Sequence, residues 1–252
     1  MTMHLKPILR YQLRDYLTSG AVLFLVNVLL FAAAFVGLIS FGTSDSEISI
    51  TSYGFTCAIF LFVFGIVVPR QSMRIGVQLG VCRRTTFLGS LLSTAIAALA
   101  LAAAGELLLT LLQVMTASLP NLYVGDLYAM LYQDMATLTP GQHLISLLFS
   151  SCLMLFCWTA GCFFTFLFWR LNKIGCVIAG ISIPVVLNVV PALLYYYSRP
   201  LAPLVSFLNL LATRAAASPW FAMALFLVIG GIIALICWLL VRNANIRGTS
   251  LK

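Results

Sequence analysis

The sequence has few charged side chains and very few of the residues that enzymes use most often. Only 8% of its residues are Asp, Glu, Lys or Arg, whereas 62% are hydrophobic and the mean hydropathy is +1.09. A soluble domain of this size is about a quarter charged and less than half apolar. Histidine occurs only as His4 and His143, and the lysines are Lys6, Lys173 and Lys252. This scarcity of charge excludes an ordinary soluble domain.

The common catalytic and nucleotide-binding motifs are also missing. The chain has no HExxH pair for a metalloprotease and no glycine-rich P-loop, because none of its lysines follows a glycine. Ser182 lies in an apolar run without an evident general base, so the pattern of an intramembrane serine protease is incomplete. We therefore expect no catalytic residue, no metal ligand and no cofactor in this chain.

The seven cysteines do not indicate a metal site. No two of them form a CxxC pair, and Cys82 lies in an arginine-rich segment while the others lie in apolar runs. Cys152, Cys157 and Cys162 are five residues apart, which turns each about 140° from the last and places them on different helix faces. We expect the apolar-run cysteines to act as small packing residues.

Several apolar runs of about 20 residues predict a polytopic helical membrane protein. The alternating segments of an outer-membrane barrel are lacking. The fold class expected is all-α, with one transmembrane domain that covers residues 1–252. The six predicted spans are residues 20–41, 53–68, 86–116, 141–169, 174–196 and 219–241. Thr139-Pro140 and Ser218-Pro219 each place a capping hydroxyl before a first-turn proline, which is typical of a helix start.

Two further segments are amphipathic or too short to cross a bilayer. In residues 1–19, basic side chains recur every four positions beside a stripe of leucines, which predicts a helix that lies in the membrane interface. A simple topogenic anchor is the alternative for this segment. Residues 198–218 contain a short apolar stretch that follows Pro200 and Pro203, and we expect it to form a re-entrant or interfacial segment on the outer side.

The distribution of charge predicts the orientation. With both termini in the cytoplasm, every basic residue except Arg199 and Arg214 falls in an inner segment, as the positive-inside rule requires. The net charge of +8 therefore reflects topology and anionic lipid at the inner leaflet. We expect no nucleic-acid partner.

The few polar or helix-breaking residues within the predicted spans are candidates for a translocation pathway. Glu106 is the most distinctive, since an ionised carboxylate costs a few kcal/mol at mid-depth in a bilayer. It either lines a pathway or is an interfacial acid with a polar neighbour or water. For Asn27 and Asn188, the alternative role is a hydrogen bond to a neighbouring helix. The pathway candidates are Asn27, Glu106, Asn188, Pro184 and Pro191.

The highest concentration of positive charge lies between the second and third predicted spans, in residues 70–84. On a helix, Arg70, Arg74 and Gln78 share one face because they recur at i, i+4 and i+8. We expect Pro69 to end the preceding span, and Gly76 and Gly80 to keep this helix short. The pattern predicts a separate amphipathic helix at the cytoplasmic side. Its arginine-rich segment contains Arg70, Arg74, Arg83 and Arg84.

This layout resembles the transmembrane permease subunit of type-2, exporter-type ABC transporters, in particular the small Gram-positive-like branch. The most specific part is the string MRIGVQLGVCRRTTFLGSLL, which starts at Met73. It is similar to the family's loop after the second span, where a short helix precedes a G-(V/I)-S-R-basic-T-x-F pattern. Cys82 stands at the serine position of that pattern, and the VRNANIRG tail is similar to the family's short basic end.

The resemblance implies a coupling helix in residues 70–84 that docks on a separate cytoplasmic ABC ATPase, where ATP and Mg would bind. It also implies a second permease subunit, identical or related, and a location in a bacterial cell membrane. The first, second and fifth spans would line the pathway for a hydrophobic or amphipathic cargo such as a peptide, lipid or drug. The ATPase-coupling residues would be Arg70, Arg74, Gln78, Gly80, Arg83 and Arg84.

Two alternatives remain beside the exporter interpretation. A non-transporting membrane sensor or an immunity protein would share the spans and would work without an ATPase. An intramembrane enzyme would lose its activity when one polar side chain is changed. Ordinary positive-inside topology is the alternative explanation of the arginines in residues 70–84.

Overall fold

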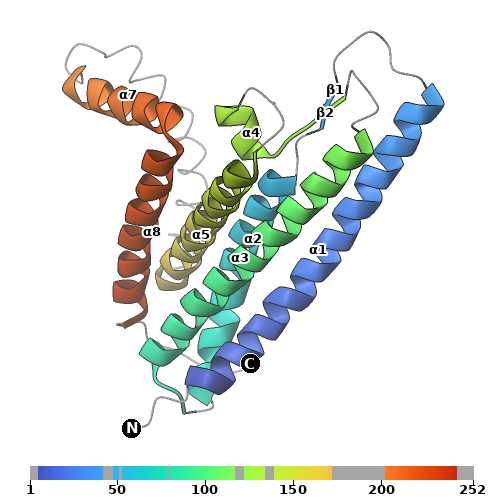
Figure 1. Ribbon diagram of the computed structural model, residues 1–252. Helices are drawn as coiled ribbons and strands as arrows, with labels where there is room; N and C mark the ends of the chain where they lie inside the picture. Colours follow the sequence, from blue (N-terminus) through green and yellow to red (C-terminus); the bar gives the residue numbers. More distant parts are fainter. Residues whose placement is uncertain are drawn as a thin grey trace.

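The computed structural model is predominantly helical (Figure 1). It describes residues 5–41, 48–50, 53–78, 80–116, 122–133, 139–171 and 202–242. The elements in chain order are α1 (Leu5–Phe41), β1 (Ile48–Ile50), α2 (Tyr53–Gln78), α3 (Arg83–Thr116), β2 (Leu122–Val124), α4 (Leu127–Tyr132), α5 (Pro140–Arg170), α7 (Ala202–Ala217) and α8 (Pro219–Arg242). Within these residues, α1, α2, α3, α5 and α8 are long and apolar enough to cross a membrane. The chain is therefore a helical, multi-pass type of membrane protein.

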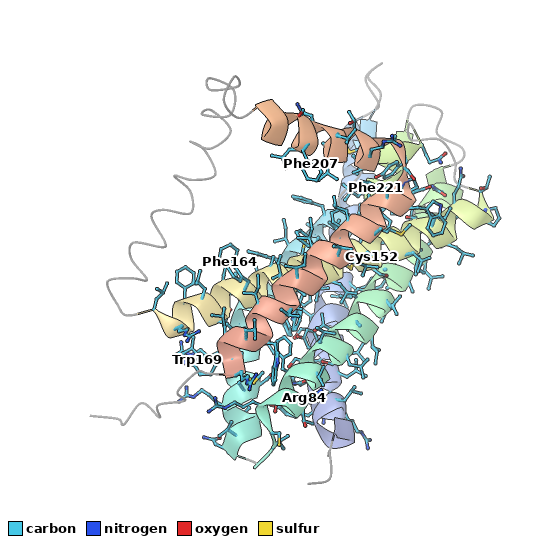
Figure 2. All side chains as sticks on the ribbon, turned by 90° about the vertical axis from the view of Figure 1, so that its left-hand side faces the viewer. Arg84, Cys152, Phe164, Trp169, Phe207 and Phe221 are labelled. Atoms are coloured by element: carbon cyan, nitrogen blue, oxygen red, sulfur yellow. The ribbon has the colours of Figure 1, made fainter. Side chains whose placement is uncertain are left out.

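The long helices form a bundle with α2, α3 and α5 at its centre (Figure 1). The helix α1 packs on α3 and lies at one edge, whereas α8 packs on α5 and lies at the other. Large apolar side chains cover the outer surfaces of these helices (Figure 2), as expected for helices that contact lipid. The short strands β1 and β2 form a parallel pair at one end of the bundle, so the helical hairpin α2–α3 connects two paired strands.

The predicted spans 86–116, 141–169 and 219–241 match α3, α5 and α8 to within a few residues. The helix α5 begins with Pro140, and the Thr139 N–H donates to Gln142 Oε1 over 2.7 Å, which satisfies one donor that a helix start leaves without a partner. The predicted span 174–196, with Ser182, Pro184, Asn188 and Pro191, lies outside the described residues.

The expected break between an interfacial helix in residues 1–19 and a first span is absent. The helix α1 continues without interruption from Leu5 to Phe41. Its first half is anchored by buried polar side chains: the Gln12 side chain donates to Ser90 Oγ over 3.0 Å, and the Tyr16 hydroxyl accepts from Trp158 Nε1 over 2.9 Å. The prediction of a separate helix was wrong because these contacts hold the segment against α3 and α5, and no residue near Gly20 interrupts the helical hydrogen bonds.

The prediction that Pro69 ends the second span was also wrong. The helix α2 runs through Pro69 and ends at Gln78, so residues 70–78 belong to α2 and residues 83–84 to α3. Proline lacks an N–H, which leaves the Gly65 carbonyl without its helical donor. The Thr165 hydroxyl of α5 lies 2.6 Å from the Ile66 carbonyl oxygen and 3.3 Å from that of Gly65. This hydroxyl has one proton, and it also lies 3.2 Å from the Gly161 carbonyl of its own helix, so the shortest bond goes to Ile66 and Gly65 accepts only a weak, shared bond. Membrane helices tolerate proline where a neighbouring hydroxyl assists the freed carbonyl.

The contact between α2 and α5 is close enough to require glycine on both helices. A Cβ atom at Gly161 would meet the Phe62 carbonyl oxygen, and one at Gly65 would meet the Trp158 carbonyl oxygen. Small residues at membrane helix contacts let two backbones approach and pack in this manner. The same core contains Cys162, which is 1% exposed, so its predicted packing role is confirmed.

The described part of the predicted outer segment 198–218 contains the helix α7, which lies at the end of the bundle where α8 begins and extends outward from it (Figure 1). The choice between a re-entrant and an interfacial segment stays a prediction. The Tyr132 hydroxyl of α4 donates to the Ala215 carbonyl over 2.7 Å and links α4 to α7. Partial burial raises the pKa of Tyr132.

Candidate functional site

One end of the bundle gathers the described arginines with the exception of Arg214. At this basic end α1 begins, α2 meets α3, and α5 and α8 end (Figure 1). Figure 2 shows Arg84 and Trp169 at this end, and Phe207 and Phe221 at the other. The basic end is defined by Arg10, Arg14, Arg70, Arg74, Arg83, Arg84, Arg170 and Arg242.

The turn between α2 and α3 is fixed by backbone hydrogen bonds. The Gly80 N–H donates to the Val77 carbonyl over 3.1 Å, and the Val81 N–H donates to the Gly76 carbonyl over 2.9 Å. These two bonds form a Schellman motif, in which the residue after the helix adopts the left-handed region. Gly80 has φ 71°, a conformation that favours glycine. The prediction that Gly80 ends the helix is therefore confirmed.

Gly76, by contrast, does not limit the helix. A Cβ atom at this position would lie 2.5 Å from Thr86 Oγ1 of α3, so the missing side chain lets α2 and α3 approach each other beside the turn. The tight turn and the close contact give the basic end a defined shape.

Two of the predicted coupling arginines have contacts within the bundle. The Arg83 Nη1 atom donates to the carbonyl oxygens of Val241 and Arg242, each over 3.4 Å, at the C-terminal end of α8. A cation at a helix C-terminus is favourable because the last carbonyls lack helical donors. The Arg70 guanidinium carbon lies 6.0 Å from the Trp169 ring centroid of α5, within the range of a cation–π contact.

The remaining predicted coupling residues face outward at the basic end. The side chains of Arg74, Gln78 and Arg84 are exposed, as is Gly80. Arg74 and Gln78 lie one helical turn apart on the last two turns of α2, and Arg84 is in the first turn of α3. Arg70 is exposed as well, although it contacts Trp169, whereas Arg83 is half-buried against the end of α8. We call the exposed surface formed by Arg74, Gln78, Gly80 and Arg84 the α2–α3 tip.

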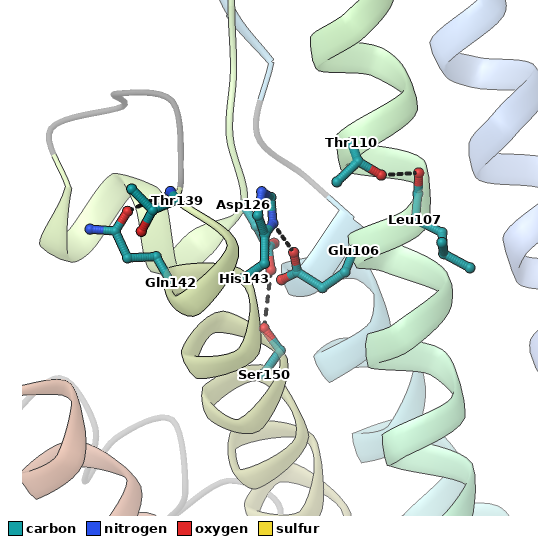
Figure 3. Close-up of polar contacts among 8 residues, drawn as sticks. All are labelled: Glu106, Leu107, Thr110, Asp126, Thr139, Gln142, His143 and Ser150. Atoms are coloured by element: carbon teal, nitrogen blue, oxygen red, sulfur yellow. Dashed lines mark hydrogen bonds and ion pairs between the residues drawn. The ribbon is translucent and has the colours of Figure 1, made fainter.

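The opposite end of the bundle holds a second group of polar residues (Figure 3). Glu106 Oε2 of α3 lies 2.8 Å from His143 Nδ1 of α5, and the two side chains are only 11% and 20% exposed. The structure therefore favours the interpretation of Glu106 as an acid with a polar neighbour, and this pair ties α3 to α5. Its role in a pathway stays a prediction.

Asp126 is a residue at this end for which the sequence analysis assigned no role. The Ser150 hydroxyl of α5 donates to Asp126 Oδ2 over 3.0 Å (Figure 3), and Asp126 Oδ1 occupies the place where a Cβ atom of Gly54 would lie. Gly54 is in the first turn of α2, so the carboxylate lies beside the positive end of that helix dipole. In the sequence Asp126 stands directly before α4, and this position does not predict its contacts with Ser150 and Gly54.

Asn27, another predicted pathway residue, is buried, with 3% of its surface exposed. Its Nδ2 atom donates to the Leu23 carbonyl of the same helix over 2.9 Å. The hydrogen bond therefore stays within α1 and does not join two helices. Asn188, Pro184 and Pro191 belong to the residues that the structure does not describe.

A buried polar seam between α1 and α3 was missed by the sequence analysis. Its members on α3 follow a helical stripe, with Ser90, Ser93 and Thr94 at i, i+3 and i+4, and each is at most 3% exposed. The Ser93 hydroxyl lies 3.4 Å from Gln12 Oε1 of α1. The hydroxyl spacing could have indicated this seam, because polar residues on one face of a membrane helix usually contact another helix.

In the part of the chain that the structure describes, no group of three His, Cys, Asp or Glu side chains is arranged to hold a metal ion. No protein-family model, curated protein or solved structure matches this chain.

Proposed function

We propose that this chain is the transmembrane permease subunit of a type-2 ABC exporter, docked through its α2–α3 tip on a separate cytoplasmic ATPase. In this proposal the basic end faces the cytoplasm of a bacterial cell, in agreement with the positive-inside rule. ATP and Mg would bind to the partner subunit. A second permease subunit, identical or related, would complete the pathway for a hydrophobic or amphipathic cargo.

The observation that carries this proposal is the continuity of α2. Its exposed residues Arg74 and Gln78 belong to the same helix as Gly65, which is in backbone contact with α5. A force applied at the α2–α3 tip would therefore reach the centre of the bundle through one helix. A separate coupling helix, as the sequence analysis expected, would transmit the force through a flexible connection.

The contacts around Pro69 support the same mechanism. Proline weakens a helix at the point where it removes a hydrogen bond. Here the Thr165 hydroxyl of α5 contacts the carbonyls on the N-terminal side of Pro69. Movement of α2 at this level would consequently move α5 as well. Rigid-body motion of packed helices is a common way to open and close a pathway.

The proposal is tested by isolating the tagged chain from its native membrane and measuring which proteins and which ATPase activity accompany it. We expect a soluble ABC ATPase in stoichiometric amount. The double variant Arg74→Glu with Gln78→Glu places two carboxylates on the exposed face of α2, and it should weaken association with an acidic surface of the ATPase about tenfold or more. ATPase stimulation by the permease should be lost to a similar extent.

Arg170→Glu is the matched control, since it reverses an exposed charge at the same end but on α5. Cys82 provides a check of insertion, because its thiol is exposed at the basic end and reports from which side an impermeant maleimide reaches it. Isolation of the chain without an ATPase, or full coupling in a double variant that inserts normally, would refute the docking proposal.

A further inference from the structure

A groove of about 590 Å³ lies between α1 and α2 at the basic end and reaches the last turns of α2. Its α1 wall is polar and includes Arg14, Asp15 and Thr18. Its α2 wall has the apolar side chains of Phe64 and Val68 on one part and the polar side chain of Gln71 on another. None of the residues that line the groove belongs to the predicted coupling or pathway set.

The groove holds one positive and one negative side chain that do not neutralise each other directly. Within the described residues, the structure shows no ion pair and no side-chain hydrogen bond for either Arg14 or Asp15. The Thr18 hydroxyl donates to the backbone carbonyl of Arg14 over 2.8 Å, and the Arg14 side chain itself is exposed. A ligand with one anionic and one cationic group would complement both side chains, whereas a purely anionic ligand would be repelled by Asp15.

The apolar part of the groove restricts the ligand further. Phe64 and Val68 lie one turn apart on the same face of α2, and the Phe64 ring packs against Tyr16 with centroids 4.7 Å apart. A soluble zwitterion has no group for this surface, but a lipid has an acyl chain that would lie along it.

We propose that the groove binds a phospholipid with a phosphoethanolamine headgroup. The phosphate accepts hydrogen bonds from the Arg14 guanidinium, the ammonium group donates to the Asp15 carboxylate, and an acyl chain lies over Phe64 and Val68. A choline headgroup has no N–H to donate to Asp15, and a glycerol headgroup has no cation. This lipid site goes beyond the exporter function and does not depend on it.

The test uses the purified full-length chain in detergent, with phosphatidylethanolamine, phosphatidylcholine and phosphatidylglycerol of identical acyl chains added separately. The midpoint of thermal unfolding is measured against lipid concentration, and native mass spectrometry records which lipid is retained in competition. We expect phosphatidylethanolamine to stabilise the wild-type chain at the lowest concentration. Equal stabilisation by all three lipids would overturn the proposal, as would preferential retention of phosphatidylglycerol.

Variants assign the preference to the groove. Asp15→Asn should remove the preference for phosphatidylethanolamine over phosphatidylcholine, because it removes the acceptor charge for the ammonium group. Arg14→Gln should weaken the binding of all three lipids about tenfold, the effect of losing one hydrogen bond to a charged group. Arg170→Gln, at the same end but outside the groove, should keep the wild-type preference. A preference that survives Asp15→Asn would overturn the proposal even if Arg14→Gln does not fold.

Discussion

Replacement of Thr165 by valine tests the contact on which the continuity of α2 depends. Valine has almost the same shape as threonine but cannot donate to the carbonyls of Gly65 and Ile66. Polar contacts between membrane helices contribute about 0.6 kcal/mol on average and up to about 1.7 kcal/mol. The single proton of the hydroxyl goes mainly to Ile66 and only in part to Gly65, which lacks a helical donor, so we expect a cost of about 1 kcal/mol.

A double-mutant cycle with Pro69→Ala isolates this effect. Alanine at position 69 restores the N–H that the Gly65 carbonyl lacks, so Thr165→Val should then lose only the bond to Ile66 and cost less than it does beside proline. The free energy of unfolding is measured by reversible unfolding in bicelles for the four proteins of the cycle. Thr159→Val is the matched control, since the Thr159 hydroxyl donates to Phe156 within α5 and should show no coupling to position 69. An equal cost of Thr165→Val with and without Pro69 would refute the reasoning.

Three further predictions concern other contacts of the bundle. Gly161→Ala should destabilise the protein by about 1–3 kcal/mol, because the added methyl group meets the α2 backbone, and unchanged thermal unfolding would contradict the close contact. Glu106→Gln should cost about 1–3 kcal/mol by weakening the pair with His143, and a cycle with His143→Gln should show that the two effects do not add. Tyr132→Phe should lose about 1 kcal/mol with the hydrogen bond to Ala215. Since burial raises the pKa of Tyr132, the unfolded chain loses this proton first, so wild-type stability should fall more than that of Tyr132→Phe as the pH rises above about 10.

The site could be predicted only in part from the sequence. The clustering of Arg70, Arg74, Arg83 and Arg84 identified the end of the molecule where the exposed surface lies. It did not separate the half-buried Arg83 from the exposed Arg70, Arg74 and Arg84, and it did not predict the contact of Arg70 with Trp169, because both features depend on residues of α5 and α8. Partners more than 80 residues away leave no local pattern around an arginine.

Hydropathy determined the helical membrane class and the limits of α3, α5 and α8, because about 20 consecutive apolar residues suffice to predict a span. Local chemistry also determined the start of α5 at Pro140 and the end of α2 at Gly80, where capping depends on neighbouring residues alone. Only the tertiary structure decided that α2 continues through Pro69 and that α1 has no break near Gly20. In the first case a hydroxyl from α5 offsets the missing hydrogen bond only in part, and in the second the contacts of Gln12 and Tyr16 with α3 and α5 hold the basic segment in the bundle. A sequence shows which backbone group lacks a partner, but the fold supplies the partner.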